Sequence, residues 1–172
     1  MDDPLEPLRS RLADLEERVT RLEGAAPTGD TSSPTAADPR FAPLEELKRN
    51  ADPQRGAVLF TGVVPLPTGE VYEWQQGAEA AELTEADWSE VAPALDALGH
   101  PVRLRLLQLV LTGTYASADL KEDPTLGTTG QLYHHLRQLV AAGWLHSTGR
   151  GRYRVPPQRV IPLLVVLAAG RS

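Results

Sequence analysis

The chain has 172 residues, a formal net charge of −6 and no cysteine. A length of this order predicts one compact domain with an extension. The lack of cysteine excludes disulfide bonds and thiolate metal sites, and it fits a reducing compartment. The first residues are acidic and the longest apolar run, 163–169, is short. We therefore expect a cytoplasmic protein without a signal peptide and without a membrane segment.

Charge is distributed unevenly along the chain. Residues 1–99 carry 8 Lys and Arg against 20 Asp and Glu, a net charge of −12, whereas residues 100–172 carry 9 against 3, a net charge of +6. Because salt screens charges that are more than about 10 Å apart, local charge governs the attraction to phosphate. The second part of the chain can therefore attract nucleic acid although the total is acidic.

Residues 1–23 contain an apolar heptad pattern, with spacings of three and four residues. Its members are Leu5, Leu8, Leu12, Leu15, Val19 and Leu22. Such a seam is buried only against a partner helix, which predicts a short coiled coil between chains. The alternative is a single amphipathic helix packed on its own domain. Residues 24–43, rich in Ala, Pro, Thr, Ser and Asp, predict a flexible linker.

Residues 44–82 predict a short helix followed by a β-hairpin. The helix would cover 44–50, and strands at 56–64 and 70–74 would flank a turn. The hairpin either only pads the domain or forms a platform for an effector or a partner. In the second case, aromatic side chains would line a pocket between the hairpin and the dimer helices: Phe60, Tyr72, Trp74 and Trp88.

Residues 83–172 predict a mainly helical domain with a small β component. Its first helix would begin at Thr84, with Asp87 three residues later completing a capping box, and Pro93 should kink or split it. A nearly all-apolar helix would follow from Pro101, and Arg103 within it is expected to form a structural ion pair. Further helices are expected over 115–122 and 160–169.

The segment from Thr128 to Val155 is the most informative part of the chain. A helix over 128–142 would bury one apolar face and end at Gly143, a residue that readily adopts a left-handed conformation. That apolar face consists of Leu132, Leu136, Leu139 and Val140. A hairpin with loop 148–152 would follow and carry arginines at its tip. This is the pair of elements that a winged helix presents to the grooves of DNA.

Over about residues 83–170 the chain resembles the ArsR/SmtB-type winged helix-turn-helix regulators. The resemblance rests on ALGHPVRLRLLQLVLTG (97–113), GQLYHHLRQLVAAGWL (130–145) and GRGRYRV (149–155). It implies a homodimer with an interface of first and last helices. It also implies binding to imperfect inverted repeats, usually as a repressor that a ligand releases. The coiled coil and the first hairpin lie outside the common core of the family.

The chain departs from the metal-sensing members of that family. Those members use cysteines, or Asp, His and Glu on the last helix, whereas residues 160–169 contain no such ligand. His134 and His135 would point about 100° apart on a helix and make no natural chelating pair. We therefore expect no metal and no cofactor. Without a Ser/His/Asp set or a phosphate loop, we also expect no enzyme.

The candidate DNA contacts lie on the predicted recognition helix and wing: Thr128, Thr129, Gln131, Tyr133, His134, His135, Arg137, Arg150 and Arg152. Short polar side chains near the start of the helix suit the major groove, and arginines suit the minor groove. Thr128 contacts a base or only caps the helix. The resemblance directs Tyr133 and His134 towards DNA, and the alternative for Tyr133 is packing on the wing. His135 and Arg137 are phosphate contacts or surface residues, and the two wing arginines contact DNA or only solvent.

The expected function is that of a sequence-specific transcription regulator, a dimeric repressor on an inverted repeat. Besides the heptad leucines, the predicted dimer contacts are Val160, Leu163, Leu164 and Leu167. The expected partners are double-stranded DNA, a second copy (or a tetramer through the coiled coil), and a small-molecule effector or regulatory protein. The alternative is an adaptor that acts through the coiled coil on another regulator.

Overall fold

The computed structural model describes residues 11, 17 and 41–171. The chain divides into two units, Met1–Ala42 and Pro43–Ser172. In the first unit, Arg11 and Glu17 are helical and exposed. The predicted heptad positions Leu5, Leu8, Leu12, Leu15, Val19 and Leu22 lie outside the described residues, as do residues 24–40 of the predicted linker. The described residues from Pro43 onward belong to the second unit.

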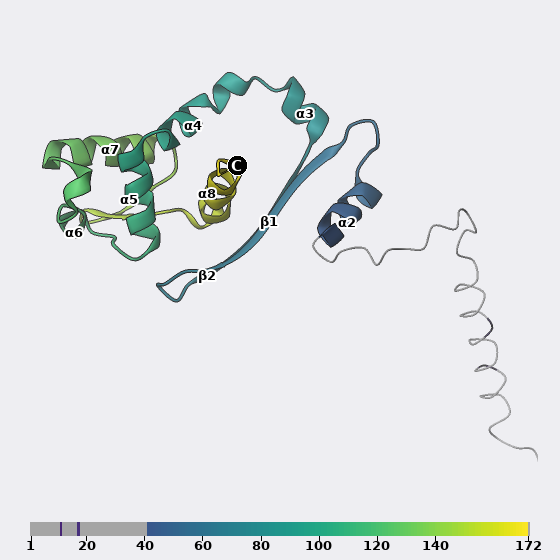
Figure 1. The fold of residues 1–172 in the computed structure, drawn as a ribbon, viewed down its shortest axis with the longest axis horizontal. Helices are drawn as coiled ribbons and strands as arrows, with labels where there is room; N and C mark the ends of the chain where they lie inside the picture. The colour runs from purple at the N-terminus through teal and green to yellow at the C-terminus, as the bar shows by residue number, and fades with distance from the viewer. Residues whose placement is uncertain (1–10, 12–16, 18–40, 172) are drawn as a thin grey trace, which may run out of the picture. The chain divides into compact units, whose positions relative to one another are not determined.

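A helix and a long hairpin come first in the segment 41–171 (Figure 1). Helix α2 (Ala42–Asn50) starts two residues earlier than predicted, because Pro43 suits the first turn of a helix. Strands β1 (Ala57–Pro65) and β2 (Val71–Glu79) then pair antiparallel. β2 is longer than predicted because its polar end, beyond Trp74, continues the ladder with β1.

One face of this hairpin packs on the last helix, α8 (Pro157–Ala169), which lies between the hairpin and the helical core (Figure 1). A Cβ atom on Gly62 would lie 2.9 Å from the Ile161 side chain, so β1 approaches α8 as closely as a glycine permits. The opposite face carries Val63 and Val71, which are exposed. The hairpin therefore depends on α8 for the burial that a two-stranded ribbon needs.

Three short segments replace the first helix expected in the C-terminal domain. They are α3 (Ala80–Glu85), the 3-10 helix η2 (Trp88–Glu90) and α4 (Ala92–Leu98), so the predicted domain boundary at 82/83 falls inside α3. The predicted capping box is wrong, because Thr84 lies within α3 and its hydroxyl donates to the Ala81 carbonyl at 3.0 Å. Asp87 caps η2 instead. Pro93 lies in the first turn of α4, which explains the break.

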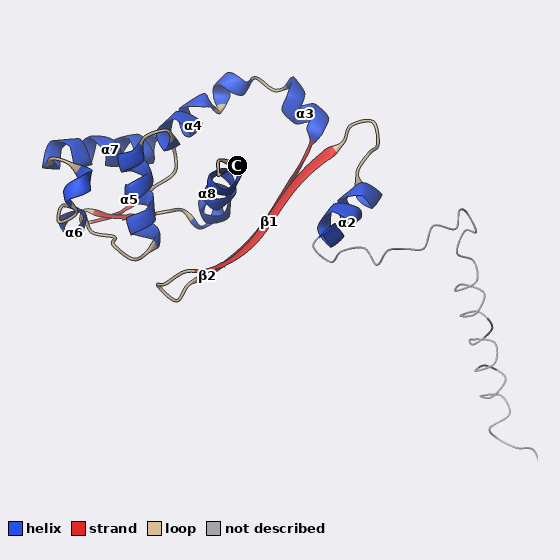
Figure 2. Cartoon of the chain, viewed as in Figure 1, coloured by secondary structure: helices blue, strands red, loops and turns tan. Residues whose placement is uncertain are grey.

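The hydrophobic core is built on α5 (Pro101–Leu111) and α7 (Thr129–Ala141), and α6 (Ser117–Leu120) and the 3-10 helix η3 (Pro124–Leu126) come between them in the chain. Figure 2 shows α5, α6 and α7 grouped at the left of the view. Seven leucines of these four elements are fully buried: Leu106, Leu107, Leu120, Leu126, Leu132, Leu136 and Leu139. Val140, predicted on the buried face, is 37% exposed. Helix α6 is shorter than predicted because Tyr115 and Ala116 pair with strand β4 instead.

A second hairpin and α8 complete the unit. The Gly143 amide donates to Val140 and the Trp144 amide to Leu139, so α7 ends in the left-handed motif that the sequence predicts. β3 (His146–Gly149) and β4 (Arg152–Arg154) follow, with a tighter loop than expected. Helix α8 contains Pro162 and packs on the core. Within the described ranges, no helix is both long and apolar enough to cross a membrane.

Candidate functional site

The start of α7 is fixed by a capping box. The Thr128 hydroxyl accepts a hydrogen bond from the Gln131 amide at 3.4 Å, and the Gln131 side-chain oxygen accepts one from the Thr128 amide at 2.8 Å. The sequence left two roles open for Thr128, a base contact or a helix cap, and the structure shows it as the cap. The Gln131 oxygen is also engaged, so its amide nitrogen is the group available to another molecule.

Beyond this cap, α7 presents a row of exposed residues to solvent. Gly130, His134 and Arg137 are three and four residues apart and therefore share one helical face, with Thr129 beside them. A Cβ atom on Gly130 would meet nothing within 4 Å. This face, termed the α7 stripe, combines hydrogen-bonding side chains with an open glycine that permits close approach.

Ser117 at the start of α6 joins α7 to the β3–β4 hairpin. Its amide donates to the Gly151 carbonyl at 2.8 Å, and its hydroxyl lies 3.2 Å from the Tyr133 hydroxyl. The ammonium of Lys121 lies 5.3 Å from the centre of the Tyr133 ring. The Ser117 hydrogen bond, with the charge of Lys121, lowers the pKa of Tyr133. Tyr133 thus packs on α6, and Ser117 places the hairpin tip beside α7.

The tip of the β3–β4 hairpin holds an arginine in an unusual backbone conformation. Gly149, Arg150 and Gly151 have φ angles of 91°, 50° and 71°. Arg150 is the non-glycine residue with positive φ among those described, and an L-residue adopts this region at an energetic cost. Its side chain and that of Arg152 are exposed. Both predicted arginines therefore lie at the tip of a short, tightly turned hairpin.

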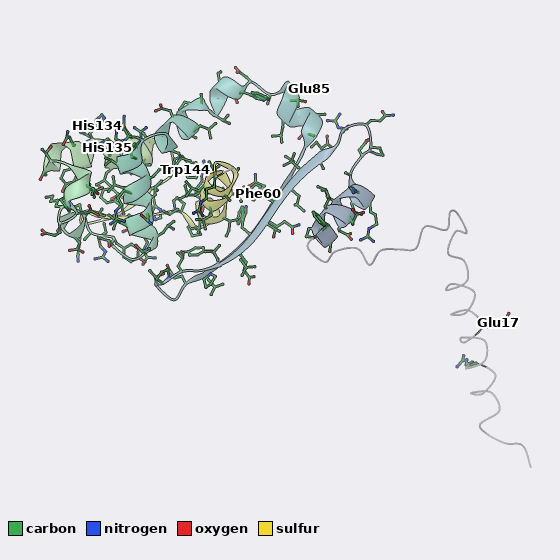
Figure 3. All side chains as sticks on the ribbon, viewed as in Figure 1. Glu17, Phe60, Glu85, His134, His135 and Trp144 are labelled. Carbon is green, nitrogen blue, oxygen red and sulfur yellow. The ribbon has the colours of Figure 1, made fainter. Side chains whose placement is uncertain are left out.

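His135 is half-buried, whereas the sequence placed it on the exposed polar face of the helix. Its ring lies 4.6 Å from that of His100, between centres, and its Nδ1 atom is buried without a hydrogen-bond partner. The ring of His134 lies 5.6 Å away, and both α7 histidines are labelled in Figure 3. Burial lowers the pKa of His135, and the nearby His100, His134 and Arg103 lower it further. In the described part of the chain, no cluster of three or more His, Asp or Glu could hold a metal ion.

Arg103 fastens the N-terminal end of α5 to α4 and α7. It is 7% exposed and donates to the carbonyls of Asp96 at 2.5 Å and Ala97 at 2.6 Å, and to the Gln138 side-chain oxygen at 2.7 Å. The Asp96 carboxylate of α4 lies at 3.7 Å, which confirms the predicted structural ion pair. Because Asp96 is largely exposed, the three hydrogen bonds are the stronger attachment.

The four aromatic residues proposed for an effector pocket do not come together. Trp88 lines a hollow of about 440 Å³ with Leu83, Val91 and Leu95, whereas Tyr72 lines a separate small hollow beside Tyr115. Phe60 and Trp74 line neither of these two hollows. These four residues therefore do not share either hollow of the single chain, and a pocket between the hairpin and the helices of a dimer stays a prediction.

The predicted dimer contacts of α8 are also corrected in part. Val160 and Leu163 are fully buried within their own chain, because the inner face of α8 completes the core. Leu164 is half-buried against that core, and Leu167 is exposed. A larger exposed apolar surface lies on α3, η2 and α4, where Trp88 is 68% exposed. Its other members are Leu83, Val91 and Leu95, and it is termed the α4 apolar surface.

The site therefore combines hydrogen-bonding groups in a row on one helix with cationic groups on a short hairpin beside it. Sequence reasoning missed Ser117 and Lys121, because a serine at a helix start and a lone lysine carry no pattern of their own.

No protein-family model matches the chain, and no curated protein or solved structure matches it.

Proposed function

We propose that the protein is a sequence-specific DNA-binding regulator of transcription, of the winged helix-turn-helix type. The observation that carries this proposal is the α7 stripe beside the arginine tip, both held through Ser117. The order of elements supports it too: α6 and α7 would be the helix-turn-helix, β3–β4 the wing and α8 the last helix, as the ArsR/SmtB-type resemblance implies. Repression follows only from that resemblance.

The α7 stripe has the chemistry needed to read base edges in the major groove. Thr129 and His134 can donate and accept hydrogen bonds, and Arg137 can bond guanine in a bidentate manner. Gly130 lets the backbone approach the groove without a side chain in the way. Contacts of this kind near the start of a recognition helix give sequence specificity.

The hairpin tip has the chemistry needed for phosphate and for the minor groove. Arg150 and Arg152 are exposed, and the chain from residue 100 onward carries a net charge of +6. Arginine in a narrow minor groove responds to the enhanced negative potential there. A backbone cost accepted at Arg150 is typical of residues at functional positions.

We propose further that the α4 apolar surface binds a second copy of this chain. An exposed tryptophan beside Leu83, Val91 and Leu95 is the composition of an interface core. Asp87 and Glu90 line the same hollow, and the exposed end of α8 offers Arg171 beside Leu167, which is complementary in charge. A two-fold dimer would present two α7 helices to half-sites about 10 base pairs apart.

DNA binding is tested by the salt dependence of affinity for a fluorescein-labelled 30-base-pair duplex. Each phosphate contact contributes about 0.9 to the slope of log affinity against log salt. We expect the double substitution Arg150→Ala and Arg152→Ala to reduce this slope by about 2. Lys48→Ala with Arg49→Ala, which removes the same charge from α2, should leave it unchanged. Failure of the wild-type protein to bind any duplex at low salt would favour the adaptor function instead.

Dimerisation is tested by sedimentation equilibrium of the full chain. Trp88→Ser should raise the dimer Kd by about 30-fold, the loss expected when an interface tryptophan is truncated. Trp74→Ser removes a 38% exposed tryptophan from β2 and should leave the Kd unchanged. Equal behaviour of the two variants would place the interface elsewhere.

A further inference from the structure

An ion pair between Glu70 and Arg154 joins the two hairpins, and these two residues are 84 positions apart in the sequence. The Nη1 atom of Arg154 in β4 donates to one carboxylate oxygen of Glu70 at 2.8 Å. The other oxygen of Glu70 accepts from the hydroxyls of Thr68 at 3.2 Å and Tyr72 at 3.3 Å. Both oxygens are therefore engaged, and Glu70 is held in place by the β1–β2 turn before it contacts Arg154.

The electrostatics of Glu70 agree with this geometry. The hydrogen bond from Arg154 holds the pKa of the Glu70 carboxyl below its ordinary value, and the same bond raises the pKa of Arg154. Burial raises the pKa of Tyr72, and the neighbouring Glu70 carboxylate raises it further. At neutral pH Glu70 is thus ionised, and the Tyr72 hydroxyl is protonated and donates a hydrogen bond to it.

Arg154 also lies beside the ring of Tyr115, which a second arginine of the hairpin, Arg152, approaches as well. Its guanidinium is 4.4 Å from the centre of the Tyr115 ring, and the guanidinium of Arg152 is 5.9 Å from the same ring. The Tyr153 amide donates to the Tyr115 carbonyl at 2.9 Å, so β4 is paired with this segment. Two cationic groups near one ring repel each other, and Glu70 offsets the charge of one of them.

We propose that Glu70 is a positioning residue for the β3–β4 hairpin, acting through Arg154. By fixing Arg154 on Tyr115, Glu70 keeps β4 paired with the segment before α6 and directs Arg152 towards the hairpin tip. The β1–β2 hairpin, which lies outside the family resemblance, is then a structural support for the arginine tip. The effect on DNA rests on the proposed function, whereas the effect on the hairpin does not.

A purely neutralising role for Glu70 predicts the opposite change in DNA affinity. If the carboxylate only neutralised a cation that would otherwise bind phosphate, its removal would strengthen DNA binding. Glu70→Gln and Glu73→Gln each remove one negative charge from β2 or its turn, and Glu73 is exposed on the other face of the hairpin. The pair therefore separates positioning from the general gain in affinity that follows the loss of an acidic group.

The first measurement is amide hydrogen exchange in the full chain without DNA. Glu70→Gln should increase the exchange rates of the Tyr153 and Ser117 amides, which bond across the hairpin and α6, by several-fold. Glu73→Gln should leave both rates unchanged. Unchanged rates in Glu70→Gln would overturn the proposal, whether or not the protein binds DNA. The thermal midpoint of each variant confirms that both are folded.

The second measurement is duplex affinity. Glu70→Gln should weaken binding by about 2- to 5-fold, the range expected for loss of a half-exposed ion pair, while Glu73→Gln should leave it unchanged or strengthen it. In an Arg154→Gln background, Glu70→Gln should cause no further loss and should behave as Glu73→Gln does, since Glu70 and Arg154 act as a unit. Tighter binding by Glu70→Gln, or additive losses in the double variant, would contradict the positioning role.

Discussion

Replacement of Arg103 by methionine tests how α4, α5 and α7 are held together. Methionine keeps most of the volume of the side chain and removes the donors, which leaves three acceptors without a partner. Asp96 lies at the surface, so its carbonyl can be hydrated, whereas Ala97 is buried and Gln138 is half-buried. A buried acceptor that loses its partner costs about 1–3 kcal/mol. We therefore expect Arg103→Met to lower the free energy of unfolding by about 3 kcal/mol.

Urea denaturation followed by tryptophan fluorescence and circular dichroism measures this loss. Trp144 is 3% exposed and its indole nitrogen donates to the Ala94 carbonyl at 2.8 Å, so its emission reports on the docking of α4. Arg105→Met is the matched control on the same helix. Arg105 is half-exposed and pairs with Asp123 at 2.9 Å, and its loss should cost less than about 1 kcal/mol. Equal losses in the two variants would refute the account of Arg103.

Four further substitutions or conditions test other parts of the structure. Thr128→Ala removes one half of the capping box and should lower the free energy of unfolding by about 1 kcal/mol in the same denaturation assay. Gly130→Ala should stabilise the fold by up to about 1 kcal/mol and yet weaken duplex binding, because the new methyl group obstructs the approach of α7 to the groove. Gly151→Ala should lower the thermal midpoint, because that residue has positive φ and its Cβ atom would lie 2.9 Å from the Ser117 hydroxyl. Burial lowers the pKa of His135 below its ordinary 6.5, so the neutral ring's contribution to stability is complete above pH 6.5 and declines as the pH falls below that value. His135→Gln should therefore make the free energy of unfolding less dependent on pH between pH 7.5 and 5.

The local features of α7 and the second hairpin were predictable from the sequence. The stop at Gly143 and the hairpin around Arg150 are confirmed, because glycine and helical periodicity act over a few residues. The same local reasoning failed at Thr84 and Asp87. There the spacing of a capping box occurs inside and just after a helix that begins earlier, at Ala80. A short motif of this kind does not identify which of two neighbouring helix starts it serves.

Contacts between distant segments were not predictable from one sequence. Periodicity placed His135 on the polar face of α7, but the residue is half-buried there and its ring lies beside that of His100. Arg154 could be seen only as one of three arginines near a hairpin, since its partner Glu70 lies in a different hairpin. Pairings of this sort depend on which elements pack together, and a spacing rule within one element carries no information about that.

The central claim is most directly tested by selection of duplexes from the fragmented genomic DNA of the host, followed by sequencing. The wild-type protein, the variant with Arg150→Ala and Arg152→Ala, and the variant with Lys48→Ala and Arg49→Ala would be compared at low salt. We expect enrichment of a two-fold site with half-sites about 10 base pairs apart, weakened only in the variant with Arg150→Ala and Arg152→Ala. A site without two-fold symmetry, equal enrichment by all three proteins, or none by any would contradict it.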